Sequence, residues 1–237
     1  LKQLQLATAK FSERKFDFVP NLKRRDEFGS LAQSFTVMAQ RLARLEVMDL
    51  DANPLTRLPG GLAIENVLSE RLAAGQPIAF CLLDIDNFKS FNDRYGYTRG
   101  NEVIKATGRI VESSIAEHGR EDAFLGHIGG DDFALIVRPE TYVPICESVI
   151  SEFDRKVLEF YDPEDRARGY ITAKTRQGKT EQFPIMTVSI AVVTNDNRKD
   201  LNSIRIGEIA AEVKEHAKSM TGSVYLIDRR ADNMLLS

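Results

Sequence analysis

The sequence has no tryptophan, two cysteines and three histidines among its 237 residues. Cys81 and Cys146 lie in apolar segments and are too few for a disulfide framework or a zinc cluster, which favours a reducing environment. No apolar run approaches the roughly 18 residues that a membrane-spanning helix needs, and no secretory signal is visible. Basic residues are not in excess, since 32 lysines and arginines face 35 aspartates and glutamates. The net charge of −3 argues against a dedicated nucleic-acid-binding surface.

The residues that are present are sufficient for a folded core, because 43% of them are hydrophobic. At about 150 residues per domain, the length predicts one large domain with an appendage. We expect a helical segment over residues 1–49 and a second domain over residues 50–237. Because the chain begins at Leu1 rather than methionine, we also expect a longer parent protein.

Residues 1–49 carry apolar side chains at heptad spacing. The first series ends before a break at residues 19–21, and the second consists of Phe28, Leu31, Phe35, Met38, Leu42 and Leu45. An apolar stripe this narrow needs another helix against it. Two interpretations stay open, a helical hairpin packed against its own domain and a parallel helical dimer.

The second domain alternates between helical and strand patterns after turn signals at residues 53–61. Residues 161–182 are polar and predict a loop or an exposed hairpin. The other expected elements are helices at about 62–74, 100–117, 141–160 and 204–219, and strands at 78–83, 124–128, 133–137, 184–193 and 224–227.

Acidic residues gather at two places where strands are expected to end or turn. Asp84 follows an apolar strand, and Asp131 and Asp132 lie in a glycine-rich turn between two short strands. Two carboxylates that converge at strand ends would form an oxygen-ligand site suited to Mg²⁺ or Mn²⁺, shared with the phosphates of a nucleotide. The alternative is that these residues are ordinary turn and cap residues, which aspartate often is.

The order and spacing of these motifs closely resemble the GGDEF domain of the diguanylate cyclase family, over about residues 50–229. The resemblance implies an α+β fold with a central, mostly antiparallel five-stranded sheet flanked by helices, related to nucleotidyl cyclase and polymerase palm domains. The matching motifs are Leu55-Thr56-Arg57-Leu58-Pro59, Asp84-Ile85-Asp86-Asn87-Phe88-Lys89, Asn92-Asp93, Gly96, Gly100 and Gly129-Gly130-Asp131-Asp132-Phe133.

The resemblance also implies an enzyme that condenses two GTP molecules into cyclic di-GMP and pyrophosphate, with Mg²⁺ or Mn²⁺ as cofactor. The implied metal ligands are the side chains of Asp84 and Asp131 and the carbonyl of Ile85. Asp131, supported by Asp132, would help to deprotonate the attacking 3′-hydroxyl. The implied GTP contacts are backbone amides at Asn87 and Phe88 with the side chains of Lys89 and Lys218 for the phosphates, and Asn92 and Asn101 for guanine.

The N-terminal segment resembles a HAMP domain, on the evidence of Asp26-Glu27-Phe28-Gly29 and the apolar residues that follow. HAMP domains are homodimeric helical coiled coils that usually follow a transmembrane helix. The resemblance therefore implies a homodimer in the inner membrane of a bacterium, anchored by a segment outside this sequence, with this portion facing the cytoplasm. Because each domain would hold one GTP, a dimer would bring two half-sites together.

Several positions depart from the family pattern. Asp132 stands where glutamate is usual, and Asn101 stands where aspartate is usual. A shorter acid predicts weakened catalysis, and a carboxamide, which both accepts and donates, predicts looser base selection with some use of ATP. Two alternatives to an active cyclase therefore remain, a catalytically silent GTP-binding module and a cyclase of relaxed base selection. The family's inhibitory product motif is incomplete, since Arg120 is followed by Ala123 where an aspartate is expected.

Overall fold

A computed structural model describes residues 2–12, 26–174, 180–196, 198 and 201–230. The chain divides into two compact units, Leu1–Ala52 and Asn53–Ser237. None of the helices in the described part of the chain combines the length and the apolar composition needed to cross a membrane.

The described residues of the first unit form two helices, α1 (Lys2–Ser12) and α2 (Glu27–Asp51). Asp26 begins α2 by accepting a hydrogen bond from the amide of Gly29 through its side chain. The rings of Phe11 and Phe35 pack with their centroids 6.0 Å apart, so the predicted apolar stripe joins the two helices. Leu31 and Met38 of the same stripe remain 45% and 42% exposed within this chain. The break expected at residues 19–21 lies outside the described residues.

The second unit is built on a five-stranded sheet in the order β2-β3-β1-β6-β7. Every neighbouring pair is antiparallel except β6 and β7, which are parallel. This arrangement confirms the predicted mostly antiparallel five-stranded sheet. The strands are β1 (Ala79–Ile85), β2 (Phe124–Gly129), β3 (Asp132–Val137), β6 (Val188–Thr194) and β7 (Val224–Ile227).

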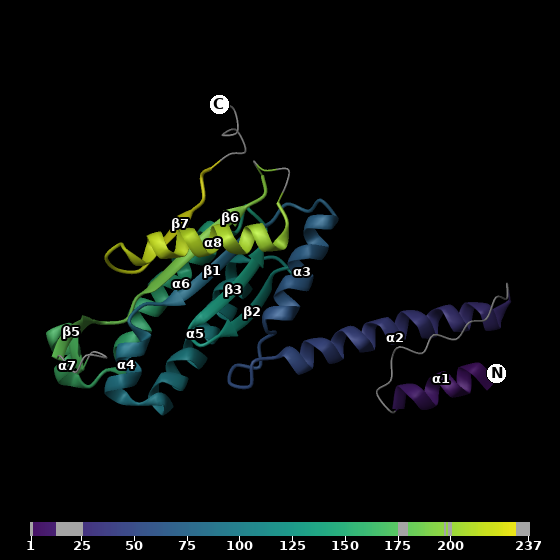
Figure 1. The fold of residues 1–237 in the computed structure, drawn as a ribbon, viewed down its shortest axis with the longest axis horizontal. Coiled ribbons are helices and arrows are strands. Elements are labelled where there is room, and N and C mark those ends of the chain that lie inside the picture. The colour runs from purple at the N-terminus through teal and green to yellow at the C-terminus, as the bar shows by residue number, and fades with distance from the viewer. Residues whose placement is uncertain (1, 13–25, 175–179, 197, 199–200, 231–237) are drawn as a thin grey trace. The chain divides into compact units, whose positions relative to one another are not determined.

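The central strand β1 is buried along its whole length because helices cover both faces of the sheet. Cys81, Leu83 and Ile85 point to the face packed against α5 (Tyr97–His118) and α6 (Tyr142–Val157). Phe80 and Leu82 point to the opposite face and pack in a second core with residues of α3 (Gly61–Ala73) and α8 (Ser203–Lys218). Figure 1 shows α3 and α8 on the same face of the sheet. Because successive side chains of a strand point to opposite faces, β1 contributes side chains to two separate hydrophobic cores. Both cysteines are buried and free.

Two segments differ from the sequence-based expectation. A short helix, α4 (Phe88–Tyr95), directly follows β1 where no helix was expected. The expected strand at 184–193 divides into the end of β5 (Thr180–Pro184) and the whole of β6. The last residues of the helix expected at 141–160 form a 3₁₀ turn, Leu158–Phe160. The polar segment after it forms a short helix α7 (Pro163–Arg168) and β4 (Tyr170–Lys174), which pairs with β5.

The hairpin predicted within residues 161–182 is present, but the segment is not uniformly exposed. Tyr161 is 5% exposed and Ile171 is completely buried, so both belong to the main core. The carboxylate of Asp165 in α7 accepts hydrogen bonds from Tyr95 Oη (2.5 Å) and Arg94 Nε (3.3 Å) and pairs with Arg168. These contacts attach α7 to the C-terminal end of α4. They also lower the pKa of Asp165, the hydrogen bond from Tyr95 being the largest cause.

Replacing Asp165 with asparagine is expected to reduce the free energy of unfolding by about 1–3 kcal/mol at neutral pH, since it removes hydrogen bonds to a charged acceptor. The lowered pKa means that the carboxylate stabilises the fold fully above its unfolded-state pKa of about 3.9, and that this contribution is lost as the pH falls through the folded-state pKa. The difference between the variant and the parent should therefore shrink below about pH 4. Thermal unfolding followed by circular dichroism across this range measures it.

The matched control is Asp162→Asn, at a carboxylate that is 51% exposed and pairs with Arg99. An exposed ion pair contributes at most about 1 kcal/mol, so this variant should unfold close to the parent. Equal destabilisation of the two variants, or an Asp165→Asn effect that grows on acidification, would contradict the stabilising role of the Asp165 contacts.

Candidate functional site

Three carboxylates meet at one end of the central strands. In the antiparallel register of β1 and β3, Asp84 lies directly opposite Asp132. Asp131 precedes Asp132 in the turn between β2 and β3. One carboxylate oxygen from each of the three lies within 4.8 Å of the others. The two acidic elements that the sequence predicted to converge are therefore adjacent in the structure.

The turn that carries Asp131 depends on glycine and on a buried histidine. Gly130 has a positive φ of 58°, which glycine adopts without strain. His127 is 1% exposed and stacks on Phe133, and its Nε2 donates to the carbonyl of Gly130 at 3.0 Å. Its Nδ1 then accepts from the hydroxyl of Thr56 at 2.9 Å. Burial lowers the pKa of His127, so a neutral imidazole braces the turn.

Two lysines of α8 contact the acidic cluster. Lys218 Nζ lies 2.8 Å from Asp84 Oδ1 and 2.9 Å from Oδ2. Lys214 Nζ lies 2.5 Å from Asp132 Oδ1 and 3.3 Å from Asp84 Oδ2. Lys218 was expected at this site from the sequence, whereas Lys214 was not. The available signal was their spacing, because residues four apart share one face of a helix.

Burial and charge shift the pKa values at this site. The pKa of Asp131 is raised, first by burial and then by the neighbouring charge of Asp84. Burial opposes the charged form of Lys214, but the hydrogen bond and charge of Asp132 outweigh it and raise the pKa of that lysine. The pKa of Lys218 is raised in the same way, since Asp84 outweighs the effect of burial. Both lysines are therefore cations at neutral pH.

The residues after β1 form the start of α4. Asn87 takes a left-handed conformation with φ of 62°, which asparagine tolerates better than most residues, and the helix begins at Phe88. Phe88 is buried and fixes this helix end against the core. The N-terminus of a helix presents free amides to an anion, as a phosphate site requires. Lys89 is largely exposed and its Nζ pairs with Asp93 Oδ2 at 2.6 Å.

The two expected guanine contacts lie near this helix. Asn92 of α4 has a buried side-chain Oδ1 without a hydrogen-bond partner among the described residues. A Cβ on Gly100 would lie 1.8 Å from that oxygen, so Asn92 occupies its position only because residue 100 is glycine. Asn101 follows in the first turns of α5 and is exposed.

The donor set at the cluster suits a divalent cation. Asp84 is 3% exposed, and its Oδ1 has no partner of hydrogen-bond geometry in the described part of the chain despite its proximity to Lys218. Carboxylate oxygens are the ligands that Mg²⁺ and Mn²⁺ prefer. Ile85, the expected carbonyl ligand, is the next residue of β1 and is buried. Asp86 instead accepts hydrogen bonds from Thr187 and Ser189, and thereby joins the end of β1 to the start of β6.

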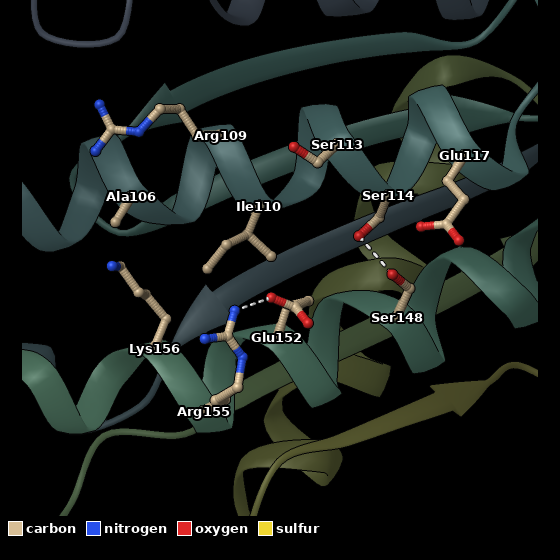
Figure 2. A pocket seen from close by; sticks show the side chains of 10 residues that line it. All are labelled: Ala106, Arg109, Ile110, Ser113, Ser114, Glu117, Ser148, Glu152, Arg155 and Lys156. Atoms are coloured by element: carbon tan, nitrogen blue, oxygen red, sulfur yellow. Dashed lines mark hydrogen bonds and ion pairs between the residues drawn. The ribbon is translucent and has the colours of Figure 1, made fainter.

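A separate groove of about 340 Å³ lies between α5 and α6 (Figure 2). None of the expected site residues lines this groove. Its charged groups are partly paired across the α6 surface, Arg155 with Glu152 and Lys156 with Glu159, and Ser114 and Ser148 are hydrogen-bonded across it at 2.9 Å. The groove is therefore distinct from the acidic cluster.

The positions that depart from the family pattern have other partners here. Asp122, two residues after Arg120, pairs with Arg138 at 2.9 Å, and its carbonyl accepts a hydrogen bond from Arg71. The expectation that the product motif is incomplete stays a prediction.

Comparison with known proteins gives a family for each part. The model of the family described as diguanylate cyclase, GGDEF domain, matches residues 50–174, and the HAMP domain model matches residues 1–44. A probable diguanylate cyclase of Escherichia coli, DgcT, is 33% identical over 173 residues, covering 70% of this chain and 34% of the relative. The diguanylate cyclase DgcS of Shewanella oneidensis is 33% identical over 91 residues, covering 38% and 29%. The chain thus spans about a third of these relatives.

Solved structures agree on the fold. Diguanylate cyclase SiaD of Pseudomonas aeruginosa, solved with its activator SiaC, matches with a TM-score of 0.61 and 21% identity, covering 96% of this chain and 79% of that one. The GGDEF domain of DgcB from Caulobacter crescentus, solved with cyclic di-GMP, matches with a TM-score of 0.54 and 23% identity, covering 76% and 96%. The GGDEF model matches more than half of this chain, and the HAMP model matches the residues before it. This chain therefore belongs to the diguanylate cyclase GGDEF family, with a HAMP domain N-terminal to the GGDEF domain.

Proposed function

We propose that this chain condenses two GTP molecules into cyclic di-GMP with release of pyrophosphate. The observation that carries the proposal is the meeting of Asp84, Asp131 and Asp132 at the ends of β1 and β3. Bound there, Mg²⁺ or Mn²⁺ would neutralise the triphosphate and make the 3′-hydroxyl more acidic. We assign the metal to Asp84, Asp131 and the carbonyl of Ile85.

The chain's own residues would then position two reacting groups. The 3′-oxygen of one GTP forms a bond to the α-phosphorus of the other, and the bond from that phosphorus to the departing pyrophosphate breaks. Asp131 accepts the hydroxyl proton as a general base next to the metal. Asp132 supports this step through the charge that it adds beside Asp131.

Substrate binding would use residues of α4, α5 and α8 near the acidic cluster. The amides at Asn87 and Phe88, at the N-terminus of α4, would receive the phosphates together with Lys218 and with Lys89 once it leaves Asp93. Asn92 and Asn101 would contact the guanine edge. Because Asn101 has a carboxamide where a carboxylate is usual, we propose that ATP is also accepted to some extent.

One domain would bind one GTP, so the reaction requires two domains face to face. We propose that the HAMP segment supplies this homodimer and is connected to a transmembrane segment of a longer bacterial protein, with this portion in the cytoplasm. The exposed apolar residues of α2, such as Leu31 and Met38, support a helical partner. The near-neutral charge gives no support to nucleic-acid binding.

The test is to incubate the purified chain with GTP, ATP or both, in Mg²⁺ or Mn²⁺, and to identify the products by chromatography and mass. We expect cyclic di-GMP from GTP and a smaller amount of mixed dinucleotide when ATP is added. A second candidate function, a silent GTP-binding module, is favoured by the ion pair of Asp132 with Lys214. GTP that binds but is not converted, even with Mn²⁺ and enforced dimerisation, would support the silent module over the cyclase.

A further inference from the structure

Lys214 lies inside the acidic cluster. Its ammonium bridges two carboxylates, with Nζ 2.5 Å from Asp132 Oδ1 and 3.3 Å from Asp84 Oδ2. Its side chain is 14% exposed, compared with 35% for Lys218 one helical turn later. Lys214 is therefore the more enclosed of the two cations.

The two lysines contact the cluster differently. The ion pair of Lys218 is with Asp84, which leaves its exposed side open to an arriving anion. Lys214 instead contacts both Asp84 and Asp132, so its ammonium pairs with carboxylate oxygens from β1 and from β3. A divalent cation held by Asp84 would need a carboxylate that Lys214 contacts, and it would be repelled by the ammonium that Lys214 places between Asp84 and Asp132.

We infer that Lys214 is a tethered counter-cation that occupies the acidic cluster and must be displaced before a divalent cation binds there. This inference rests on the proposed function and adds a property of that site. Its consequence is a weak affinity for the metal alone, because every binding event must first break the ion pairs of Lys214. A nucleotide would favour displacement, since its phosphates offer the released ammonium a new partner.

The experiment titrates Mn²⁺ alone into the metal-free full chain and follows free Mn²⁺ by electron paramagnetic resonance. Lys214→Met keeps a long side chain without the charge, and Lys156→Met is the matched control on the surface of α6. Lys214→Met should bind Mn²⁺ at least about fivefold more tightly than the parent, the lower end of usual couplings between competing ligands. Lys156→Met should bind like the parent.

Asp84→Asn, introduced into both the parent and Lys214→Met, locates the ion. If Asp84→Asn weakens Mn²⁺ binding but Lys214→Met does not tighten it, the counter-cation inference is overturned and the proposed metal site stands. If Asp84→Asn leaves Mn²⁺ binding unchanged in both backgrounds, the ion is not at the cluster and both proposals fail.

A second variant keeps the inference testable if Lys214→Met does not fold. Lys214→Gln removes the charge but keeps a donor for Asp132, and it should also bind Mn²⁺ more tightly than the parent. Without metal, both variants leave carboxylates without a bridging cation, so their melting temperatures should fall, and Mn²⁺ should raise them by more than it raises that of the parent. An equal Mn²⁺-dependent rise in all three proteins would overturn the inference.

Discussion

Asp131→Asn is expected to lower the rate of cyclic di-GMP synthesis by about 100- to 1,000-fold, since a metal's contribution is worth several kcal/mol and each 1.4 kcal/mol is tenfold. Asparagine has nearly the same volume but carries no charge to hold the metal or to accept the proton. Asp131 lies in a half-buried turn that Gly130 and His127 shape independently of its carboxylate. The initial rate at saturating GTP and Mg²⁺ measures the loss, and the melting temperature shows that the fold is kept.

The control for this variant is Asp162→Asn, the same chemical change at an exposed carboxylate of the segment before α7. It should leave the rate near that of the parent. An Asp131→Asn rate within about threefold of the parent would exclude both assigned roles of this residue, because either one alone should cost more.

Gly100→Ala is expected to weaken GTP binding by about 10- to 100-fold, because displacing a buried polar group from its position costs about 1–3 kcal/mol. The added Cβ would lie 1.8 Å from Asn92 Oδ1 and 2.9 Å from its Cγ, so the amide must move. The helix itself should gain slightly from alanine, which separates loss of binding from loss of stability. Binding of a non-hydrolysable GTP analogue, measured by calorimetry, gives the effect directly.

Gly108→Ala provides the matched control in the same helix. A Cβ there would meet Leu58 and Phe133 at 3.6 Å, which is ordinary van der Waals contact. This variant should bind the analogue like the parent. If Gly100→Ala also binds the analogue like the parent, GTP binding does not require Asn92 in its present position. That result would contradict the proposed contact of Asn92 with guanine.

The acidic cluster was predictable because its signals are local. The apolar strand before Asp84 and the two glycines before Asp131 each indicate a strand end or a turn, and pairing of β1 with β3 brings them together. The mostly antiparallel sheet followed from a family resemblance carried by these same motifs. The strands that the sequence identified, such as β2 and β3, are short apolar runs bounded by turn residues.

What sequence analysis missed depends on contacts between distant residues. The helix α4 has eight residues, and only Phe88 and Phe91 among them are buried, so no periodicity could distinguish it from a loop. The helix that carries Lys214 was expected, but its packing over β6 and β1 was not. The contact from Lys214 to Asp132 spans 82 positions, and nothing near Lys214 in the chain indicates it.

The polar composition of residues 161–182 also concealed a packed element. Asp165 is 1% exposed, although aspartate in a polar run is usually at the surface. Its burial is compensated by Tyr95 and Arg94, which come from a helix 70 positions earlier. A sequence pattern contains no information about such a partner, so an exposed hairpin was the natural expectation.

The position of Asp84 on the middle strand limits how this protein can be regulated. Residues of β3 and β6 are paired with it on both sides. Moving this aspartate would break ladders on two sides at once, which makes gradual adjustment of the chemistry from a distant helix energetically unfavourable. A signal that reaches the domain would more easily change how often two intact copies meet in a productive orientation. Regulation of such a protein would act on the association of two copies and not on the geometry of each active site.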